Sequence, residues 1–232
     1  MSSLHLVRIP IHAPRLLRFA VDHGITQEDE TLGYTLHAWF AALFGEEAPK
    51  PFRYLERRSE VLGYARRPSS ELLQRAQAFA SPGAWSALVA EGLTSKPMPT
   101  EWRRGLRLRL EVLACPVSRK DNEEKDVYLR ALDRTGAETP PRSDVYRQWF
   151  MAQWREALRL EQVELLGMSA RSQLLRRARN GGNRLRVVER PQALFGADAV
   201  VQDGTAFAAQ LARGIGRHRA FGFGMVLLAP PR

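Results

Sequence analysis

The chain has 232 residues, which is enough for one large domain or two small ones. Hydrophobic residues make up 44% and charged residues 26%, so disorder, collagen and a coiled coil are excluded as descriptions of the whole chain. The formal net charge is +10, and 31 of the 35 basic residues are arginine, which grips phosphate with two parallel hydrogen bonds. This charge indicates a polyanionic partner, most readily a nucleic acid, although a GC-rich genome would also favour arginine codons.

Features that would place the chain in a membrane or an oxidising compartment are not found in the sequence. No stretch approaches the roughly 20 consecutive apolar residues that a membrane span requires. The first residues, Met-Ser-Ser-Leu-His, lack the basic and apolar regions of a signal peptide. The single cysteine, Cys115, excludes an internal disulfide framework. We therefore expect a cytoplasmic protein with no membrane partner.

Hydrophobic spacing predicts the elements of the N-terminal part of the chain. Residues 28–44 form the strongest predicted helix, because Leu32, Leu36 and Phe40 recur at helical spacing and Gly45 ends the run. Residues 96–99 contain two prolines and are expected to form a linker. The other predicted elements are a strand at 4–11, a helix at 14–23, strands at 52–56 and 61–65, a helix at 69–80 and a short helical segment at 85–91.

In the C-terminal part, residues 105–114 alternate leucine with arginine, which predicts a strand with Arg107 and Arg109 on its outer face. That face either borders an RNA groove or meets water. Residues 118–144 are polar and charged, and we expect them to form a long loop. The other predicted elements are a helix at 143–159, a strand at 163–168, a short basic helix before a turn at 180–183, strands at 184–189 and 192–201, a helix at 205–213 and a last strand at 225–229.

The order of these elements is roughly β-α-β-β-α-β, twice. This order predicts an α+β protein with tandem ferredoxin-like (RRM-like) domains and helical insertions. We place the N-terminal domain, with the helix that carries His37, at residues 1–100. The C-terminal domain, with a basic insertion and a glycine-rich loop, would span residues 101–232.

The segment from Ser169 to Arg190 contains seven arginines and a single acid, Glu189. A merely solvated helix face usually interleaves both signs of charge, and this segment does not. We therefore predict that it lies on the backbone of a nucleic acid. The arginines of this segment that are predicted to bind RNA are Arg171, Arg176, Arg177, Arg179, Arg184 and Arg186.

The most specific feature is the run Gly-Ile-Gly-Arg-His-Arg-Ala-Phe-Gly-Phe-Gly at residues 214–224. Its glycines allow positive φ, and successive N–H groups would form a concave anion site beside the cationic trio. It is neither a dinucleotide fingerprint nor a P-loop, because a helix precedes it and no Gly-Lys-Ser/Thr is present. A tight helix-to-strand connection remains the alternative. The residues predicted to contact RNA here are Gly214, Gly216, Arg217, His218, Arg219, Gly222 and Gly224.

A Gly-x-Gly-x(5)-Gly-x-Gly loop just before a final apolar strand resembles the glycine-rich loop of CRISPR-associated repeat-RNA endoribonucleases of the RAMP superfamily. The nearest branch is the CasE (Cse-type) nucleases or their type IV relatives. The strand at 106–116, which ends in Ala-Cys-Pro, and the run Tyr34-Thr-Leu-His37 on the first long helix support the resemblance. It implies that Tyr34 and His37 carry the active site.

The sequence also departs from this family's pattern. A helical segment is added at about residues 14–24, and residues 169–183 resemble an arginine-rich insertion. No lysine follows His37 on its helix, although some relatives have one there. An arginine such as Arg15 or Arg18 would then stabilise charge in its place.

The residues favour metal-free chemistry. Five scattered histidines, one cysteine and no His-Glu-x-x-His motif give no basis for a metal site or another cofactor. Metal-free RNA cleavage needs a base for the 2′-hydroxyl, an acid for the 5′-oxygen and cations near the phosphate. His37 lies at the border of the apolar stripe of its helix, and Tyr34 lies on the same flank. A packing or surface histidine is the alternative, and His218 is the rival candidate.

We therefore expect a metal-independent endoribonuclease that cuts CRISPR precursor RNA within repeat stem-loops by 2′-hydroxyl attack. It would keep the mature crRNA and join the other subunits of an effector complex. A non-catalytic RAMP-type RNA-binding subunit of such a complex is the first alternative. A basic scaffold protein without any role in RNA binding is the second.

Overall fold

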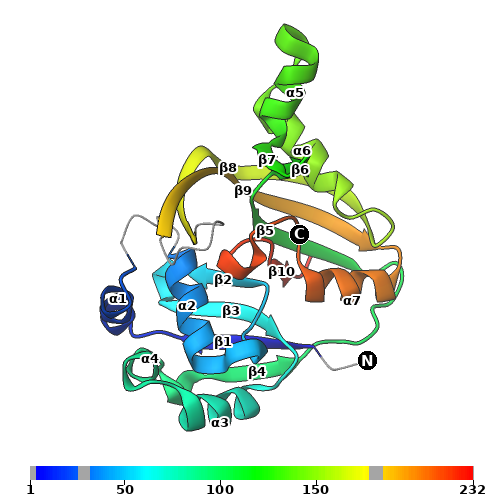
Figure 1. Ribbon diagram of the computed structural model, residues 1–232. Coiled ribbons are helices and arrows are strands. Elements are labelled where there is room, and N and C mark those ends of the chain that lie inside the picture. The colour runs from blue at the N-terminus through cyan, green and yellow to red at the C-terminus, as the bar shows by residue number, and fades with distance from the viewer. Residues whose placement is uncertain (1–3, 26–31, 178–184, 232) are drawn as a thin grey trace. The chain divides into compact units, whose positions relative to one another are not determined.

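The computed structural model describes residues 4–25, 32–177 and 185–231 (Figure 1). Its contacts divide the chain into two compact units, which are described separately. Unit 1 adds two later segments to the N-terminal stretch, and unit 2 takes the rest. Unit 1 comprises Met1–Thr100, Gln173–Glu189 and Arg219–Gly222, and unit 2 comprises Glu101–Ser172, Arg190–His218 and Phe223–Arg232.

Unit 1 contains an antiparallel four-stranded sheet with the order β2-β3-β1-β4. The central strand β1 alternates buried Val7 and Ile9 with exposed Arg8, as expected when one face of a strand packs on a core. Its register pairs His5 with Ala65 of β3 and with Pro97 of β4. The four strands are β1 (His5–Pro10), β2 (Phe52–Leu55), β3 (Glu60–Ala65) and β4 (Thr94–Pro97).

Helices α2 (Gly33–Phe44) and α3 (Ser69–Phe79) connect these strands in the order β-α-β-β-α-β. Within unit 1, α2 lies across one face of the sheet (Figure 1). Its buried side contributes Trp39 to the core, and the indole N–H donates to the carbonyl oxygen of Ala84 at 2.9 Å. Unit 1 also contains helices α1 (Ala13–Asp22) and α4 (Pro82–Ser86) and short 3-10 turns at Gly45–Glu47, Glu56–Arg58 and Ala90–Gly92.

Unit 2 repeats the plan with the strand order β10-β5-β9-β8. In each sheet the first strand lies between the fourth and the third, and the second strand is at the edge, which is the split βαβ arrangement. The predicted fold class of tandem ferredoxin-like halves is therefore confirmed. The elements are β5 (Arg107–Ala114), α6 (Arg142–Ala152), β8 (Leu158–Arg177), β9 (Leu185–Val201), α7 (Gly204–Arg213) and β10 (Val226–Ala229), with β8 and β9 contributing residues to both units.

The long loop predicted at residues 118–144 is wrong. Asp121 and Asn122 have φ values of 50° and 60°, which suit a two-residue hairpin turn. Hydrophobic periodicity did not predict this hairpin, because its strands are polar and have no alternating apolar residues. The segment forms β6 (Val117–Lys120), β7 (Glu123–Asp126), α5 (Val127–Thr135) and a 3-10 turn at Gly136–Glu138, and within unit 2 helix α5 projects away from the sheet (Figure 1).

The basic helix predicted after Ser169 is also wrong, because these residues continue strand β8 as far as Arg177. Arginine is compatible with helices, but the long strand β9 offers a hydrogen-bonded ladder that overrides this weak preference. The two strands predicted at 184–189 and 192–201 are one strand, β9. The linker predicted at 96–99 begins inside β4, and the helix predicted at 143–159 ends at Ala152.

The hairpin β6–β7 is attached to α6 through a buried carboxylate. The side chain of Asp126 is only 5% exposed and accepts hydrogen bonds from the backbone N–H of Tyr128 at 2.8 Å, from the hydroxyl of Tyr146 at 2.9 Å and from the guanidinium of Arg142. We expect Asp126→Ala to lower the free energy of unfolding by about 3 kcal/mol, because it leaves a half-buried guanidinium without its counter-charge. Thermal or denaturant unfolding measures this loss.

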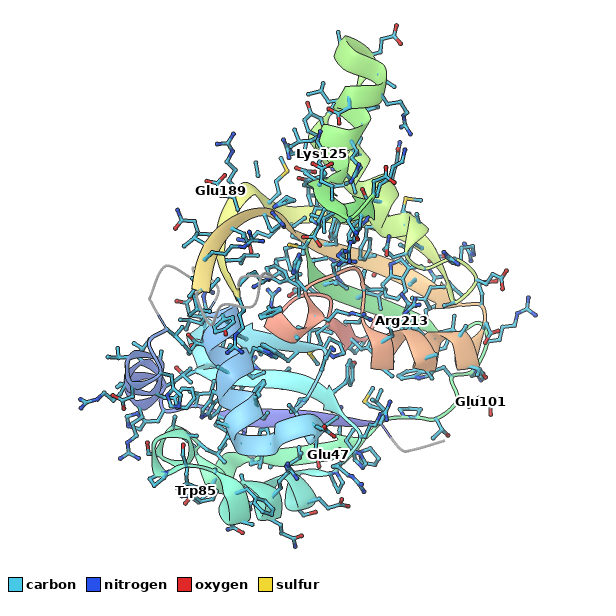
Figure 2. The ribbon with its side chains drawn as sticks, in the orientation of Figure 1. Glu47, Trp85, Glu101, Lys125, Glu189 and Arg213 are labelled. Carbon is cyan, nitrogen blue, oxygen red and sulfur yellow. The ribbon has the colours of Figure 1, made fainter. Side chains whose placement is uncertain are left out.

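Asp133→Ala is the matched control. Asp133 is exposed and accepts a hydrogen bond at 2.5 Å from Lys125, which Figure 2 labels. Removing an exposed partner of this kind changes stability by only about 0.5 kcal/mol. Equal losses for Asp126→Ala and Asp133→Ala would contradict the attachment.

Candidate functional site

His37 lies on the solvent side of α2. Its neighbours Leu36 and Trp39 are fully buried in the core of unit 1, whereas His37 is exposed. Tyr34, one turn earlier, is buried, and its ring centroid lies 6.3 Å from that of His37. The helix therefore holds the two predicted catalytic side chains next to each other on one flank.

A third ring reaches this pair from near the C-terminus. Phe221 ends the 3-10 turn Arg219–Phe221, which belongs to unit 1. Its ring centroid lies 4.8 Å from that of His37 and 6.2 Å from that of Tyr34, to which it is nearly parallel. Distances in this range are typical of packed aromatic pairs. The structure thus brings part of the predicted glycine-rich loop to the predicted catalytic histidine.

Arg176 covers the same aromatic cluster. Its guanidinium carbon lies 3.8 Å from the centroid of the Phe221 ring, which is a cation–π contact. The Arg176 guanidinium also donates to the carbonyl oxygen of Leu175 at 2.5 Å. Arg176 is in the last part of β8, within unit 1, so the strand that replaces the predicted basic helix delivers a cation to the site.

The surroundings of His37 favour its neutral form. Partial burial of the ring lowers the pKa of His37 below its usual value, and the positive charges of Lys50, Arg176 and Arg177 lower it further. A neutral imidazole can accept a proton at neutral pH, and nearby cations can stabilise a phosphate that gains negative charge. The arrangement therefore suits proton transfer beside a phosphodiester.

The cation near His37 that sequence reasoning missed is Lys50. The arginines suggested in place of a helix lysine make other contacts: Arg15 donates to the carbonyl oxygen of Ser86 and Arg18 pairs with Asp22. Lys50 comes after α2, just before the cis-proline Pro51 that precedes β2. Lysine is rare in this sequence, but that rarity does not indicate that Lys50 lies near His37.

The first part of the glycine-rich loop, residues 214–218, belongs to unit 2. Gly214 donates its N–H to the carbonyl oxygen of Gln210 at 2.7 Å, and Gly224 donates its N–H to that of Leu113 at 2.7 Å. The backbone of this loop is closed by a further bond of 2.8 Å from the N–H of Ile215 to the carbonyl oxygen of Gly224. These N–H groups serve the fold, so the expected anion site is not built from them.

The cationic side chains of the same loop converge on one carboxylate of β7. Glu124 accepts hydrogen bonds from Arg217 Nε at 2.5 Å and from His218 Nε2 at 2.7 Å. Arg190, from β9, donates its Nε to Glu124 at 2.7 Å. The predicted RNA-binding residues Arg217 and His218 are therefore held together by an acid that the sequence did not single out.

The arginines of β5 are also matched with acids. Arg107 donates to Glu161 at 2.5 Å and remains largely exposed. Arg109 is 12% exposed and donates to Glu164 at 2.6 Å and to Asp198 at 3.3 Å. The bond to Glu164, with help from Asp198, raises the pKa of Arg109. The strand face was expected either to border an RNA groove or to meet water. Arg109 instead lies in a largely buried network of ion pairs. RNA contact by Arg107 stays a prediction.

The remaining predicted RNA-binding residues are spread over both units. Arg171, Arg177 and Arg186 are exposed on β8 and β9. Arg219 and Gly222 are half-buried, and a Cβ at position 222 would lie 3.5 Å from the Phe52 ring. Arg179 and Arg184 lie outside the described residues. RNA binding by these residues stays a prediction.

Across residues 4–25, 32–177 and 185–231, no helix has both the length and the apolar composition of a membrane span. Within the same ranges, no group of three or more His, Cys, Asp or Glu side chains is placed to hold a metal ion.

The fold and the site together define the class as an α+β protein of two ferredoxin-like halves that carries an exposed histidine beside an aromatic cluster and basic side chains. A family model described as CRISPR associated protein matches residues 4–230. The chain therefore belongs to this family of CRISPR-associated proteins, and the resemblance inferred from the glycine-rich motif is confirmed.

Solved structures show the same fold over nearly the whole chain. A CRISPR endoribonuclease Cse3 bound to a 19-nt RNA matches with a TM-score of 0.65 at 18% identity, covering 98% of this chain and 100% of that one. Thermus thermophilus Cse3 bound to an RNA that represents a pre-cleavage complex matches with a TM-score of 0.60 at 18% identity and the same coverage. Cas6e from Escherichia coli K-12 matches with a TM-score of 0.57 at 15% identity, again covering 98% and 100%. A comparison with curated proteins finds no match.

The loop depends on a glycine at position 224 for space as well as for backbone conformation. Gly224 has a φ of 76°, and a Cβ there would lie 2.1 Å from the carbonyl oxygen of Ile215. We expect Gly224→Ala to destabilise the protein by about 3 kcal/mol or more, because the backbone must move. Gly136→Ala is the control: its φ is 55° with open space around it, so it should cost only about 1 kcal/mol. Equal shifts in the melting temperature would contradict the steric argument.

The charges around His37 can be tested without any activity. Histidine in model peptides has a pKa of about 6.5, and we expect NMR titration to give a lower value for His37. Arg176→Gln should raise the pKa of His37, because it removes a positive charge that opposes protonation. Arg18→Gln removes the same charge elsewhere on unit 1 and should leave the pKa unchanged. Identical shifts in both variants would show that net charge, and not the local site, sets the pKa.

Proposed function

We propose that the chain is a metal-independent endoribonuclease that cuts CRISPR precursor RNA within the repeat stem-loop. The observation that carries the proposal is the cluster in unit 1, where His37 packs against Phe221 beside Tyr34. Lys50 and Arg176 supply positive charge to the same place. Membership of the CRISPR-associated family and the fold shared with Cse3 and Cas6e support this function.

The reaction that fits these groups is transesterification within the RNA strand. His37, neutral at neutral pH, accepts the proton of a 2′-hydroxyl while that oxygen attacks the adjacent phosphorus. The bond from phosphorus to the 5′-oxygen breaks, and an acid gives that oxygen a proton, which balances the proton lost by the 2′-hydroxyl. The products are a 2′,3′-cyclic phosphate and a 5′-hydroxyl, so no water or metal ion is consumed. The cations stabilise the negative charge that builds on the phosphorane.

RNA recognition would rely on backbone contacts. The net charge of +10 attracts a polyanion, and exposed Arg171, Arg177 and Arg186 lie along β8 and β9. The deep groove of A-form RNA is too narrow for ordinary side-chain readout, so shape and phosphate contacts would dominate.

We further infer that the chain keeps its product and joins an effector complex. A chain of a CRISPR RNA-guided surveillance complex shares the fold, with a TM-score of 0.54 at 19% identity. The cyclic-phosphate product has the same stem and nearly the same backbone charge as the substrate, so the contacts that bind the one also hold the other. The mature crRNA and the other subunits of such a complex are the partners that this proposal assigns.

Replacing the histidine tests the chemistry. We expect His37→Ala to slow cleavage of repeat hairpin RNA about a hundredfold or more, because a general acid–base group contributes at least this much. Binding of the hairpin should change little, because the cations remain. Single-turnover cleavage in EDTA with mass analysis of the product ends is the measurement, and EDTA should not slow the wild-type chain.

His12→Ala is the control, since His12 is an exposed histidine of unit 1 at the start of α1. It should cut at the wild-type rate. Normal cleavage by His37→Ala would remove His37 from the chemistry, and loss of cleavage in EDTA would refute the metal-free mechanism. A wild-type chain that binds the hairpin but never cuts it would be the non-catalytic RNA-binding subunit.

A further inference from the structure

The strongest charge cluster among the described residues outside the His37 site surrounds Glu124 in unit 2. The Glu124 side chain is only 12% exposed. It accepts hydrogen bonds from three basic side chains, of which Arg190 comes from β9 while Arg217 and His218 come from the glycine-rich loop. One acid thus joins two segments that are distant in sequence.

The hairpin holds Glu124 rigidly in this place. Glu124 stands opposite Arg119 in the β6–β7 ladder, and Asp126 follows it two residues later on the same face. Asp126 is bonded to Tyr146 of α6. A carboxylate on such a braced strand has little freedom, so it can fix the side chains that it binds.

Glu124 remains ionised throughout the physiological pH range. Burial alone would raise its pKa, but the hydrogen bonds and charges of His218, Arg190 and Arg217 outweigh burial and hold the pKa far below its usual value. Even with His218 neutral, one carboxylate faces two guanidinium groups. The cluster therefore keeps a net positive charge and still attracts a phosphate.

The loop backbone does not fix the directions of these side chains by itself. Its base is held by backbone bonds to the carbonyl oxygens of Gln210 and Leu113, and a Cβ at position 216 would lie 3.1 Å from the Trp149 ring. His218 has a φ of 60°, which is unusual for a residue with a side chain, and its ring donates Nε2–H to Glu124. Arg217 is 43% exposed, and its bond to Glu124 is made through Nε.

We propose that Glu124 is a positioning residue that holds Arg217 and His218 in the orientation in which the loop binds a phosphate of the RNA backbone. This role rests on the proposed function. Glu124 does not touch the RNA itself and acts through the two cations. A guanidinium fixed at Nε loses less freedom when it binds a phosphate than an unrestrained one, and this pre-organisation strengthens binding.

The test compares Glu124→Gln with Glu123→Gln, its exposed neighbour on β7. Both variants remove one negative charge, so their long-range attraction for RNA is the same. A fluorescently labelled repeat hairpin RNA is titrated with each variant at several salt concentrations. We expect Glu124→Gln to bind the hairpin about tenfold more weakly than Glu123→Gln, although the two variants have the same net charge. The slope of log affinity against log salt concentration should also become shallower, by about the amount that one phosphate contact contributes.

Two further variants separate positioning from folding. Glu124→Asp keeps the charge but draws the carboxylate back, and it should also weaken binding relative to the wild type. Arg217→Gln should weaken binding by itself, and adding Glu124→Gln to it should weaken binding by much less than Glu124→Gln does alone, since the acid acts largely through Arg217. A general loss of structure would instead add to the effect of Arg217→Gln.

The outcomes distinguish the two proposals. Binding by Glu124→Gln that equals or exceeds binding by Glu123→Gln would overturn the positioning role, and tighter binding would show that Glu124 competes with the phosphate. The proposed function would survive that result, because wild-type binding and cutting are measured separately. A wild-type chain that does not bind the hairpin would overturn both proposals.

Discussion

The packing of Phe221 against α2 brings residues from the C-terminal part of the chain to the first long helix, and the candidate site follows from this contact. The ring packs against that of His37, and partial burial of the imidazole lowers its pKa. The same ring supports the guanidinium of Arg176 on β8. One aromatic side chain therefore couples the desolvation of the histidine to the delivery of a cation. Burial and positive charge act in the same direction, so the two effects reinforce each other.

Much of the fold could be predicted because its elements have strong periodicity. The spacing of Leu32, Leu36 and Phe40 identified the helix α2, which begins at Gly33, and the leucine–arginine alternation identified β5. The hairpin β6–β7 and the extended β8 were missed for a physical reason. The strands of this hairpin are polar, and residues 169–177 of β8 are rich in arginine, so neither segment shows the apolar alternation that reveals a strand, and cross-strand pairing sets the conformation of both.

The candidate site was only partly predictable for a similar reason. Tyr34 and His37 lie one turn apart on one helix, so local spacing suggested that they act together. Lys50 and Glu124 belong to other elements, and only the tertiary fold brings each to its cationic or anionic partners. The amino-acid composition also suggested more positive charge available for a ligand than the structure provides. Arg109, for example, is matched by Asp198 of β9 and Glu164 of β8, so an arginine count does not measure the charge available to a ligand.

The glycines of the loop show why a motif can identify a family and still mislead about mechanism. An anion site needs N–H groups that point to the ligand, but those of Gly214 and Gly224 are donated to backbone carbonyl oxygens. Gly224 is required because the carbonyl of Ile215 occupies the space where a Cβ would lie. The loop is thus a compact support whose side chains, not its N–H groups, carry the positive charge. A fixed counter-charge can orient mobile arginines on such a support, and this is the role that we propose for Glu124, which bonds to both Arg217 and His218.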